Sequence, residues 1–300
     1  MSKTVVSRWI GNALQALSAR CSENVKVEGK QLSLQKDITV AVATHKPYRM
    51  PNDGCYLPLH VGASLHPEVC LDMQQDNQGD NISQKNGSYS ELTGMYWLWK
   101  NCQSKYKGLV HYRRHFGLPN SKINASKDPF DRIASTSDFE NIFKSSHAKV
   151  IVPSARNYLI ETVESHYRHT LPEEQLDATR AVLAIDCPEY IRAFDIEMSG
   201  TKAHLFNMFI AEKDIFDSYC EWLFPLLADI ENELVSYSYD AFNARWPGRI
   251  SEMLLDTWLI TNGINWVEMP VVSPEPIDWV AKGKGFLAAK FLGKKYSRSF

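Results

Sequence analysis

The sequence lacks several features that would assign it to a protein class at once. None of its 300 residues belongs to an apolar run of 18, which argues against a membrane-spanning helix. The formal net charge is −2, so no overall field attracts nucleic acid. The 6 cysteines are scattered and form no Cys-x-x-Cys pair, which favours reduced thiols over a zinc ribbon or a disulfide framework. The first residues lack a long apolar stretch, so we expect no signal peptide and a cytoplasmic protein.

The composition that remains is that of an ordinary globular protein. Hydrophobic residues make up 44% and charged residues 23% of the chain. We expect an N-terminal amphipathic helical extension (1–35), a single domain (36–278) and a basic amphipathic tail (279–300). The domain divides into two halves, 36–155 and 156–278, because helical patterns dominate after residue 156.

Apolar runs predict the strands, and helical spacing predicts the helices. Residues 52–87 are polar, contain several prolines and are expected to be an irregular connection. Ser88 and Glu91 fit the capping box of a helix over 88–103. Further strands are expected at 37–44, 107–116, 147–153, 204–210 and 268–272, and further helices within 159–198, 215–235 and 247–260.

A basic segment follows the second predicted strand. His111, Arg113, Arg114 and His115 come directly after the apolar pair at 109–110. Arginine donates two parallel hydrogen bonds to phosphate oxygens, and ligands of open α/β sheets lie beyond the carboxyl ends of strands. We therefore expect a phosphate-bearing ligand here; the alternative is an arginine pair that bridges two structural acids. Zinc binding by the two histidines is disfavoured because the arginines between them would repel a metal ion.

The last 22 residues combine six basic side chains with apolar ones and contain no acid. This pattern is typical of a helix that binds a membrane surface. A solvated terminal helix is the alternative.

Several motifs together resemble a known family. They are Ala-Thr-His-Lys after the first strand, Asn-Ile-Ser-x-Lys-Asn-x-x-Tyr-x-Glu-Leu-Thr-x-x-Tyr-x-x-Trp-Lys from Asn81, Gly-Leu-x-His-Tyr-Arg-Arg-x-Phe from Gly108, Asn-Met-Phe-Ile from Asn207, and Glu-x-Leu-Leu-x-x-Trp-Leu from Glu252. The chain between Asp37 and Val272 resembles bacterial surface-polysaccharide glycosyltransferases, a family formerly filed as a domain of unknown function. Its members occur in capsule, exopolysaccharide and O-antigen clusters.

The resemblance implies an α/β, GT-A-like fold: a mixed, mostly parallel central sheet flanked by helices, with helical additions in the C-terminal half. The implied reaction is inverting transfer of galactofuranose from UDP-galactofuranose to a lipid-linked or growing surface polysaccharide. The enzyme would lie peripherally on the inner face of the cytoplasmic membrane, with homo-oligomerisation left open. Alternatives are another UDP-sugar such as UDP-galactopyranose, or a non-catalytic phosphate- or nucleotide-binding assembly subunit at the membrane. A phosphoesterase is disfavoured because no carboxylate–histidine metal cluster is evident.

The donor site is expected in the first half of the domain. Many GT-A enzymes hold Mn²⁺ or Mg²⁺ with Asp-x-Asp at a strand end; that motif is missing here, so we expect no metal requirement. His111, Arg113 and Arg114 would neutralise the leaving diphosphate instead. Tyr89 would stack on uracil, whereas Glu91 has the capping box as its alternative role. The further donor-binding candidates are Thr44, His45 and Asn86.

The acceptor side is expected in the second half. An inverting reaction needs one carboxylate near the acceptor hydroxyl, and Glu252 is our candidate for this general base. Its alternative role is a helix ion pair with Arg249. Asp195 and Asp256 are weaker candidates for the base, His204 and Asn207 are candidates for binding the acceptor sugar, and His166 and His169 are expected in surface or core roles.

Overall fold

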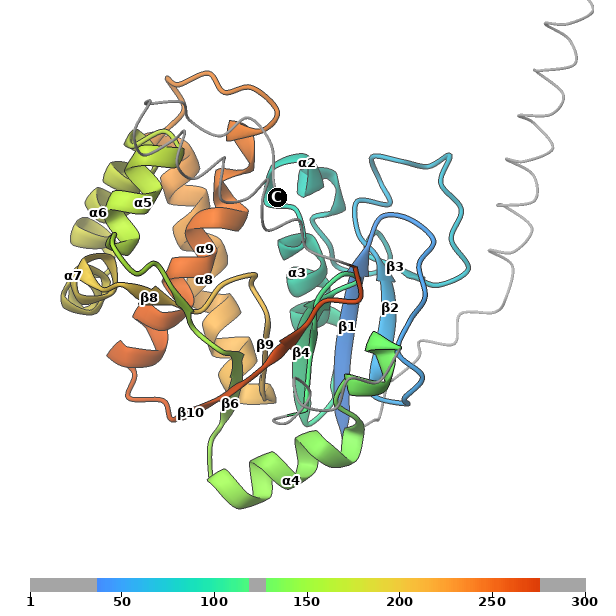
Figure 1. Cartoon of the computed structure of the whole chain (residues 1–300). Helices are drawn as coiled ribbons and strands as arrows, with labels where there is room; N and C mark the ends of the chain where they lie inside the picture. The colour runs from blue at the N-terminus through green and yellow to red at the C-terminus, as the bar shows by residue number, and fades with distance from the viewer. Residues whose placement is uncertain (1–36, 119–127, 276–300) are drawn as a thin grey trace, which may run out of the picture.

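A computed structural model describes residues 37–118 and 128–275. Its central feature is a 7-stranded sheet with the order β10-β6-β9-β4-β1-β2-β3 (Figure 1). Strands from both predicted halves of the domain contribute to this sheet. The strands are β1 (Ile38–Thr44), β2 (Tyr56–His60), β3 (Gln74–Gln75), β4 (Tyr106–His111), β6 (Val150–Pro153), β9 (Phe209–Glu212) and β10 (Trp266–Met269), with the small pairs β5 (His115–Phe116) and β11 (Val271–Val272), and β7 (Arg156–Asn157) and β8 (Lys202–Ala203), beside it.

The sheet is mixed but mostly parallel. β1 is buried along its whole length and pairs in parallel with both β2 and β4. Its continuous β-branched and apolar sequence suits a strand covered on both faces. β9 runs antiparallel between β4 and β6, and β10 pairs in parallel with β6. The predicted fold class is therefore confirmed.

Helices cover both faces of the sheet. On one face α3, α8 and α9 pack against Ala41, Leu109 and Val150, and on the other α4 packs against Val40 and Val110. Figure 1 shows α5, α6 and α7 gathered beside α9, away from β1. The helices are α2 (Asn86–Tyr89), α3 (Leu92–Asn101), α4 (Thr136–Ser146), α5 (Val163–Thr170), α6 (Glu174–Asp186), α7 (Ile191–Ser199), α8 (Lys213–Glu233) and α9 (Trp246–Thr261), with short 3-10 turns η2 (Ser83–Lys85), η3 (Pro129–Arg132), η4 (Pro188–Tyr190) and η5 (Asn243–Arg245).

Three local predictions are wrong. The connection over 52–87 contains β2, a strand that we missed because Pro58 lies in its middle. The helix over 88–103 is broken at Ser90, whose φ is 52°, so α3 begins after Glu91 and the capping box with Ser88 does not form. The strand expected at 204–210 begins only at Phe209, since Phe206 and Asn207 adopt left-handed backbone conformations.

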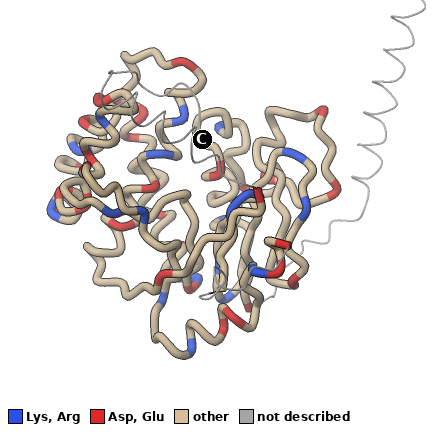
Figure 2. Tube along the Cα trace, viewed as in Figure 1, with Lys and Arg blue, Asp and Glu red and all other residues tan. Residues whose placement is uncertain are grey.

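Charges of both signs are interspersed along the described chain (Figure 2). Within the described ranges, no helix combines the length and apolar character that crossing a membrane requires. Cys55, Cys102, Cys187 and Cys220 are free thiols, but Cys70 is disulfide-bonded, so the prediction of reduced thiols is wrong for that residue. The expected extension (1–35) and tail (279–300) lie outside the described residues.

A buried carboxylate holds the loop that follows β2. Asp76 is 0% exposed and accepts hydrogen bonds from the backbone N–H groups of Gly62 and Ala63, at 2.8 and 3.1 Å. It also accepts from the hydroxyls of Ser83 at 2.6 Å and Thr93 at 2.7 Å. These bonds replace the water that the carboxylate loses on burial. They join the end of β2 to α3.

We expect Asp76→Ala to lower the free energy of unfolding by about 3 kcal/mol, because it leaves four donors without their charged acceptor. Urea denaturation would measure the loss. Asp72→Ala, at an exposed position nearby, is the control and should change stability by less than about 0.5 kcal/mol. Equal effects of the two substitutions would contradict the role of Asp76.

Candidate active site

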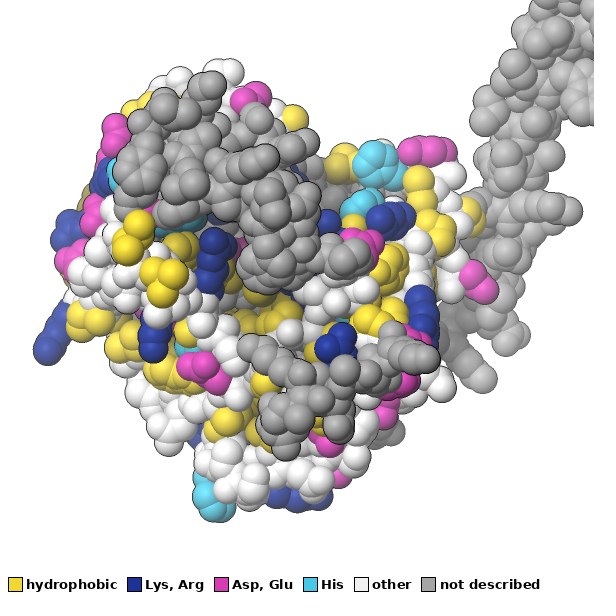
Figure 3. Space-filling model, viewed as in Figure 1, with side chains coloured by type: hydrophobic (Ala, Val, Ile, Leu, Met, Phe, Trp, Pro, Cys, Tyr) yellow, Lys and Arg dark blue, Asp and Glu magenta, His cyan; other side chains and the backbone are white. Residues whose placement is uncertain are grey.

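A pocket of about 530 Å³ opens where β1, β2 and β4 end. Because these strands are parallel, their carboxyl ends meet at one edge of the sheet, the usual place for ligands in such folds. Figure 3 shows histidine and basic side chains close together over the loops that follow β1 and β2. The lining consists of Ala43, His45, Val61, His66, Val69, Asn86, Gly87, Ser90, Glu91, His111, Tyr112, Arg113 and Arg245.

The two arginines of the basic segment lie on different sides of a tight turn. Backbone hydrogen bonds of 3.2 and 3.0 Å between His111 and Arg114 close this turn after β4. Arg113 lines the pocket. Arg114 instead lies over the ring of Phe206, 4.3 Å from its centroid, and faces the carboxylates described below. The position of Arg113 suits a contact with the donor, whereas that of Arg114 does not support one.

Positive charge converges on His45. Burial lowers the pKa of this histidine, and the charges of Lys46, Arg113 and Arg245 lower it further. Arg245 comes from η5 in the second half of the domain and donates through Nε to the Ser90 hydroxyl at 3.0 Å. We missed Arg245 because no strand or motif in the sequence connects it with the basic segment. An anionic ligand in this pocket would meet fixed cations from both halves of the chain.

Two carboxylates interact at this pocket, and one of them, Glu252, lies outside its lining. Burial raises the pKa of Glu252, in the second turn of α9, to about 7, and the negative charge of Glu91 adds to this effect. The backbone amide of Phe206 and the charge of Arg114 oppose the shift. Glu91 also lines the pocket. A carboxylate with a pKa near 7 suits a general base at neutral pH.

The turn formed by Phe206 and Asn207 connects the groups of the site. The carbonyl of Phe206 accepts a hydrogen bond of 2.5 Å from His111, so Nε2 of that histidine carries the proton. Burial lowers the pKa of His111, with the charges of Arg114 and Arg113 acting in the same direction. Asn207 donates to Glu91 at 2.7 Å.

Other predicted site residues have structural roles. Tyr89 is 2% exposed and lies in the core, so a uracil contact has no support in this geometry. Thr44, at 1% exposure, closes the turn after β1 by donating to the Lys46 carbonyl at 2.7 Å. Asn86 lines the pocket while its amide donates to the Ser90 carbonyl at 2.7 Å.

The candidates on the acceptor side also differ from expectation. His204 is buried, and its Nδ1 lies 2.6 Å from Asp256. Neither residue lines the pocket. Asn207 is 4% exposed, and its side chain donates hydrogen bonds to Glu91 and to the carbonyl of Gly248. Neither geometry supports direct contact with an acceptor sugar. Asp195 is held by two hydrogen bonds from Arg180, of 2.8 and 2.9 Å, and is not a free base.

The alternative role of Glu252 does not occur. Arg249 donates to the carbonyl of Phe242 at 2.6 Å, and its guanidinium lies over the Phe242 ring. Among the described ion pairs within 4 Å, none joins Glu252 to Arg249. The charge of Arg249 nevertheless acts on Glu252, in the same direction as that of Arg114.

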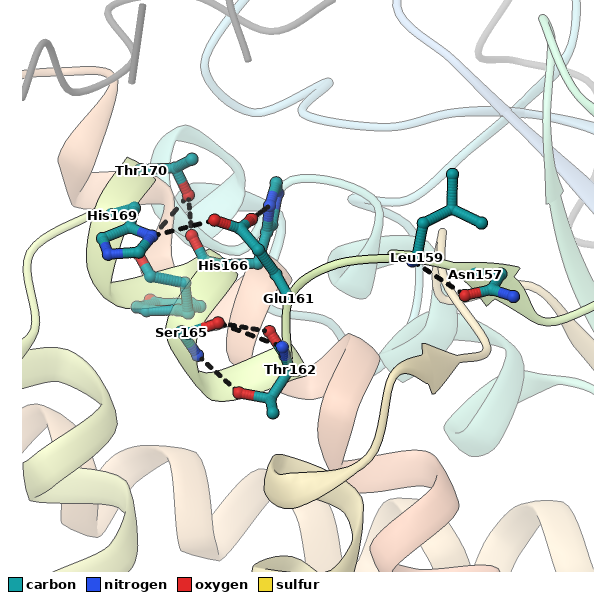
Figure 4. Close-up of polar contacts among 9 residues, drawn as sticks. Asn157, Leu159, Glu161, Thr162, Ser165, His166, His169 and Thr170 are labelled. Carbon is teal, nitrogen blue, oxygen red and sulfur yellow. Dashed lines mark hydrogen bonds and ion pairs between the residues drawn. The ribbon is translucent and has the colours of Figure 1, made fainter. Parts of the chain in front are cut away.

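The histidine pair on α5 forms a separate polar cluster (Figure 4). The buried Glu161 accepts from Nδ1 of His166 at 3.1 Å and from Nδ1 of His169 at 3.0 Å. These histidines therefore hold the beginning of α5, in keeping with the expected structural role.

Burial lowers the pKa of His115 to about 4. In residues 37–118 and 128–275, no three His, Cys, Asp or Glu side chains are grouped to hold a metal ion.

Comparison with known proteins shows the family of the chain. The family described as a domain of unknown function (DUF4422) matches residues 39–263, and the chain belongs to this family. The solved apo structure of the bifunctional glycosyltransferase WbbM is similar, with a TM-score of 0.69 and 26% sequence identity. The match covers 79% of this chain but 45% of that one, so the chain spans less than half of WbbM. No curated protein matches the sequence.

We expect the pKa of Glu252 to be visible in the pH dependence of stability. The folded protein keeps this proton up to about pH 7, whereas the unfolded chain loses it near the ordinary value of 4.5. The contribution of Glu252 to the free energy of unfolding is therefore full below pH 4.5, and roughly 3 kcal/mol of it is lost as pH rises from there through 7. Urea denaturation at pH 5 to 8 should show Glu252→Gln losing less stability than wild type. Parallel curves would contradict the raised pKa.

Proposed function

We propose that this chain is a glycosyltransferase that uses a nucleotide-diphosphate sugar. The observation that carries the proposal is that a pocket lined by cations lies next to two carboxylates, Glu91 and Glu252. Glu91 and His111 belong to the lining of this pocket, and the charge of Glu91 acts on both His111 and Glu252. Glycosyl transfer needs both, because a diphosphate leaves with negative charge while an acceptor hydroxyl loses a proton. The likeness to WbbM supports the same reaction class.

The donor lies in the pocket at the sheet edge. Arg113 and Arg245 face its diphosphate from the two halves of the domain, with His45 between them. These fixed cations neutralise the charge that develops as the bond to the sugar breaks, so we propose that transfer requires no metal ion. The family resemblance favours UDP-galactofuranose as donor, and UDP-galactopyranose is the alternative.

Glu252 acts as the general base. The acceptor hydroxyl attacks the anomeric carbon on the side opposite the diphosphate, which inverts the configuration, and its proton passes to the Glu252 carboxylate. The raised pKa of about 7 matches this task, since a base that is too weak would not hold the proton in the transition state.

The acceptor is a lipid-linked or growing surface glycan. Such an acceptor would bring the enzyme to the inner face of the cytoplasmic membrane. The basic tail (279–300) remains our candidate for that contact and lies outside the described residues. A non-catalytic nucleotide-binding subunit would share the pocket but would not need the carboxylate pair.

Glu252→Gln should lower the rate of sugar transfer by a factor of about 10² to 10⁴ and leave UDP affinity within about twofold of wild type. The amide cannot accept the acceptor proton, whereas the pocket is unchanged. Product release from a donor and a synthetic lipid-linked acceptor measures the first effect, and calorimetry measures the second. Unchanged transfer would remove Glu252 from the role of base.

Arg113→Ala and Arg245→Ala should each weaken UDP binding about tenfold, because each removes a charge-assisted contact with the diphosphate. The measurement is the UDP-dependent rise in melting temperature in EDTA, where a metal-independent site still binds. Arg192→Ala, at an exposed position on α7, is the matched control and should bind like wild type. Loss of wild-type UDP binding in EDTA would contradict the metal-independent site.

A further inference from the structure

Two neighbouring apolar side chains lie in solvent in the loop between β7 and α5, which we call the apolar loop (158–161). Leu159 is 79% exposed and Ile160 is 69% exposed. Single exposed apolar residues are common on protein surfaces, whereas adjacent ones can form part of an interaction site. Leu159 also has a φ of 61°, a strained conformation that persists only where the surrounding structure imposes it. The protein therefore displays this apolar pair at a cost in backbone energy.

Backbone hydrogen bonds fix the shape of the apolar loop. The N–H of Tyr158 donates to the carbonyl of Thr201 at 2.8 Å. The N–H of Leu159 donates to Oδ1 of Asn157 at 2.8 Å, and that of Ile160 to the carbonyl of Tyr158 at 2.7 Å. A loop that is already held in one conformation loses little conformational entropy when a partner binds.

The end of the loop is anchored on α5. Glu161 is buried and accepts from His166 and His169, the polar cluster drawn in Figure 4. In the same view the side chain of Leu159 points away from that cluster. The polar anchor and the exposed apolar side chains thus lie on different sides of the same short segment.

The exposed charge beside the apolar loop is positive. Arg156 and Lys202 are exposed on the two strands of the β7–β8 ribbon, from which the loop continues. Residues 154–162 and 199–203 are all described by the structure, and Glu161, which is buried, is the only acid among them. This combination of exposed cations and apolar side chains is complementary to an anionic surface with an apolar interior.

Two acids in neighbouring elements have partners of their own. Glu164 on α5 accepts from Nε of Arg168 at 2.9 Å. Glu268 on β10 accepts from the N–H of Ala155 at 3.2 Å and lies 3.3 Å from Nε2 of His204. Their negative charge is therefore shared with donors of the protein.

The apolar loop follows the sheet edge at which the pocket opens. β6 is parallel to β1 and β4, because β9 pairs antiparallel with both β4 and β6. The carboxyl ends of these three parallel strands therefore lie at one edge, and only Ser154 and Ala155 separate β6 from β7. In Figure 1 both β1 and β6 point upward, and the chain continues from β6 to α5. A surface that met the loop would lie toward the same edge as the pocket.

We propose that the apolar loop is a contact with an anionic lipid bilayer, in which Leu159 and Ile160 enter the boundary of the acyl chains while Arg156 and Lys202 meet lipid phosphates. The inference rests on the proposed function, because a lipid-linked acceptor lies in such a bilayer, and it assigns a surface through which the enzyme reaches that acceptor. Buried apolar area and attraction of basic side chains to anionic lipids together determine the strength of interfacial binding.

The test is binding of the full chain to phosphatidylcholine vesicles with and without phosphatidylglycerol, measured by sedimentation. Leu159→Ser/Ile160→Ser should lower the partition coefficient for the mixed vesicles about tenfold, because it removes the apolar contact. Ile185→Ser/Ile260→Ser, at exposed positions near the ends of α6 and α9, is the matched control and should bind like wild type. Equal losses in the two double variants, or no wild-type binding to the mixed vesicles, would overturn the proposal.

The cations are tested separately. Arg156→Ala and Lys202→Ala should each weaken binding to the mixed vesicles about fivefold and leave binding to phosphatidylcholine alone unchanged. Lys144→Ala, at an exposed position on α4, is the matched control and should bind like wild type. These single variants also keep the proposal testable if the apolar double variant does not fold. Wild-type binding by both Arg156→Ala and Lys202→Ala would exclude anionic lipid as the partner.

Sedimentation velocity without lipid distinguishes a bilayer from a second copy of the chain. We expect the same sedimentation coefficient for wild type and Leu159→Ser/Ile160→Ser. A wild-type dimer that this variant loses would assign the apolar loop to an interface between copies and overturn the proposal.

Vesicle binding needs no turnover, so absence of sugar transfer by wild type would defeat the proposed function alone. In the active enzyme, Leu159→Ser/Ile160→Ser should transfer sugar about tenfold more slowly to an acceptor held in mixed vesicles. Transfer to a short, water-soluble acceptor should keep the wild-type rate, because the pocket is unchanged. Equal slowing with both acceptors would show that the loop does not act through the membrane.

Discussion

The site depends on the repulsion between two carboxylates that the fold holds close together. Glu91 lies between α2 and α3, and α2 packs against α9, the helix that carries Glu252. A half-buried pair of acids is unfavourable unless other groups share the charge. The charge of Arg114 and the backbone amide of Phe206 act on Glu252, and the side chain of Asn207 donates to Glu91. Each acid therefore has a polar partner from the same turn before β9.

Cations from both halves of the domain line the pocket together with Glu91, whereas Glu252 lies outside the lining. Arg113 and His45 come from the loops after parallel strands, whereas Arg245 comes from the chain that leads into α9. The pocket therefore forms only when the two halves of the domain are folded together. The antiparallel strand β9 makes this possible, because it pairs with β4 and carries the Phe206–Asn207 turn directly before it.

The sequence predicts what depends on local pattern and misses what depends on long-range contact. β1 and β4 were predictable from continuous apolar runs, and Glu252 was predictable as an acid in the second turn of a helix. Tyr89 and His204 looked equally available, but burial assigns them to the core. Arg245 could not be found, because only the tertiary packing of η5 against α2 brings it to Ser90.

The neighbouring residues Arg113 and Arg114 lie in different places, which is also a result of tertiary contacts and not of local sequence. From the sequence alone, Arg113 and Arg114 are expected to bind phosphate as a pair, because both guanidinium groups present the same hydrogen-bond donors. The tight turn after β4 sends them to different sides, one to the pocket and the other to the ring of Phe206. Burial lowers the pKa of Arg114, while the nearby charges of Glu252 and Glu91 favour its ionised form. Its guanidinium thus faces Glu252 and Glu91, and an anionic ligand in the pocket would meet Arg113 and the other cations that converge on His45.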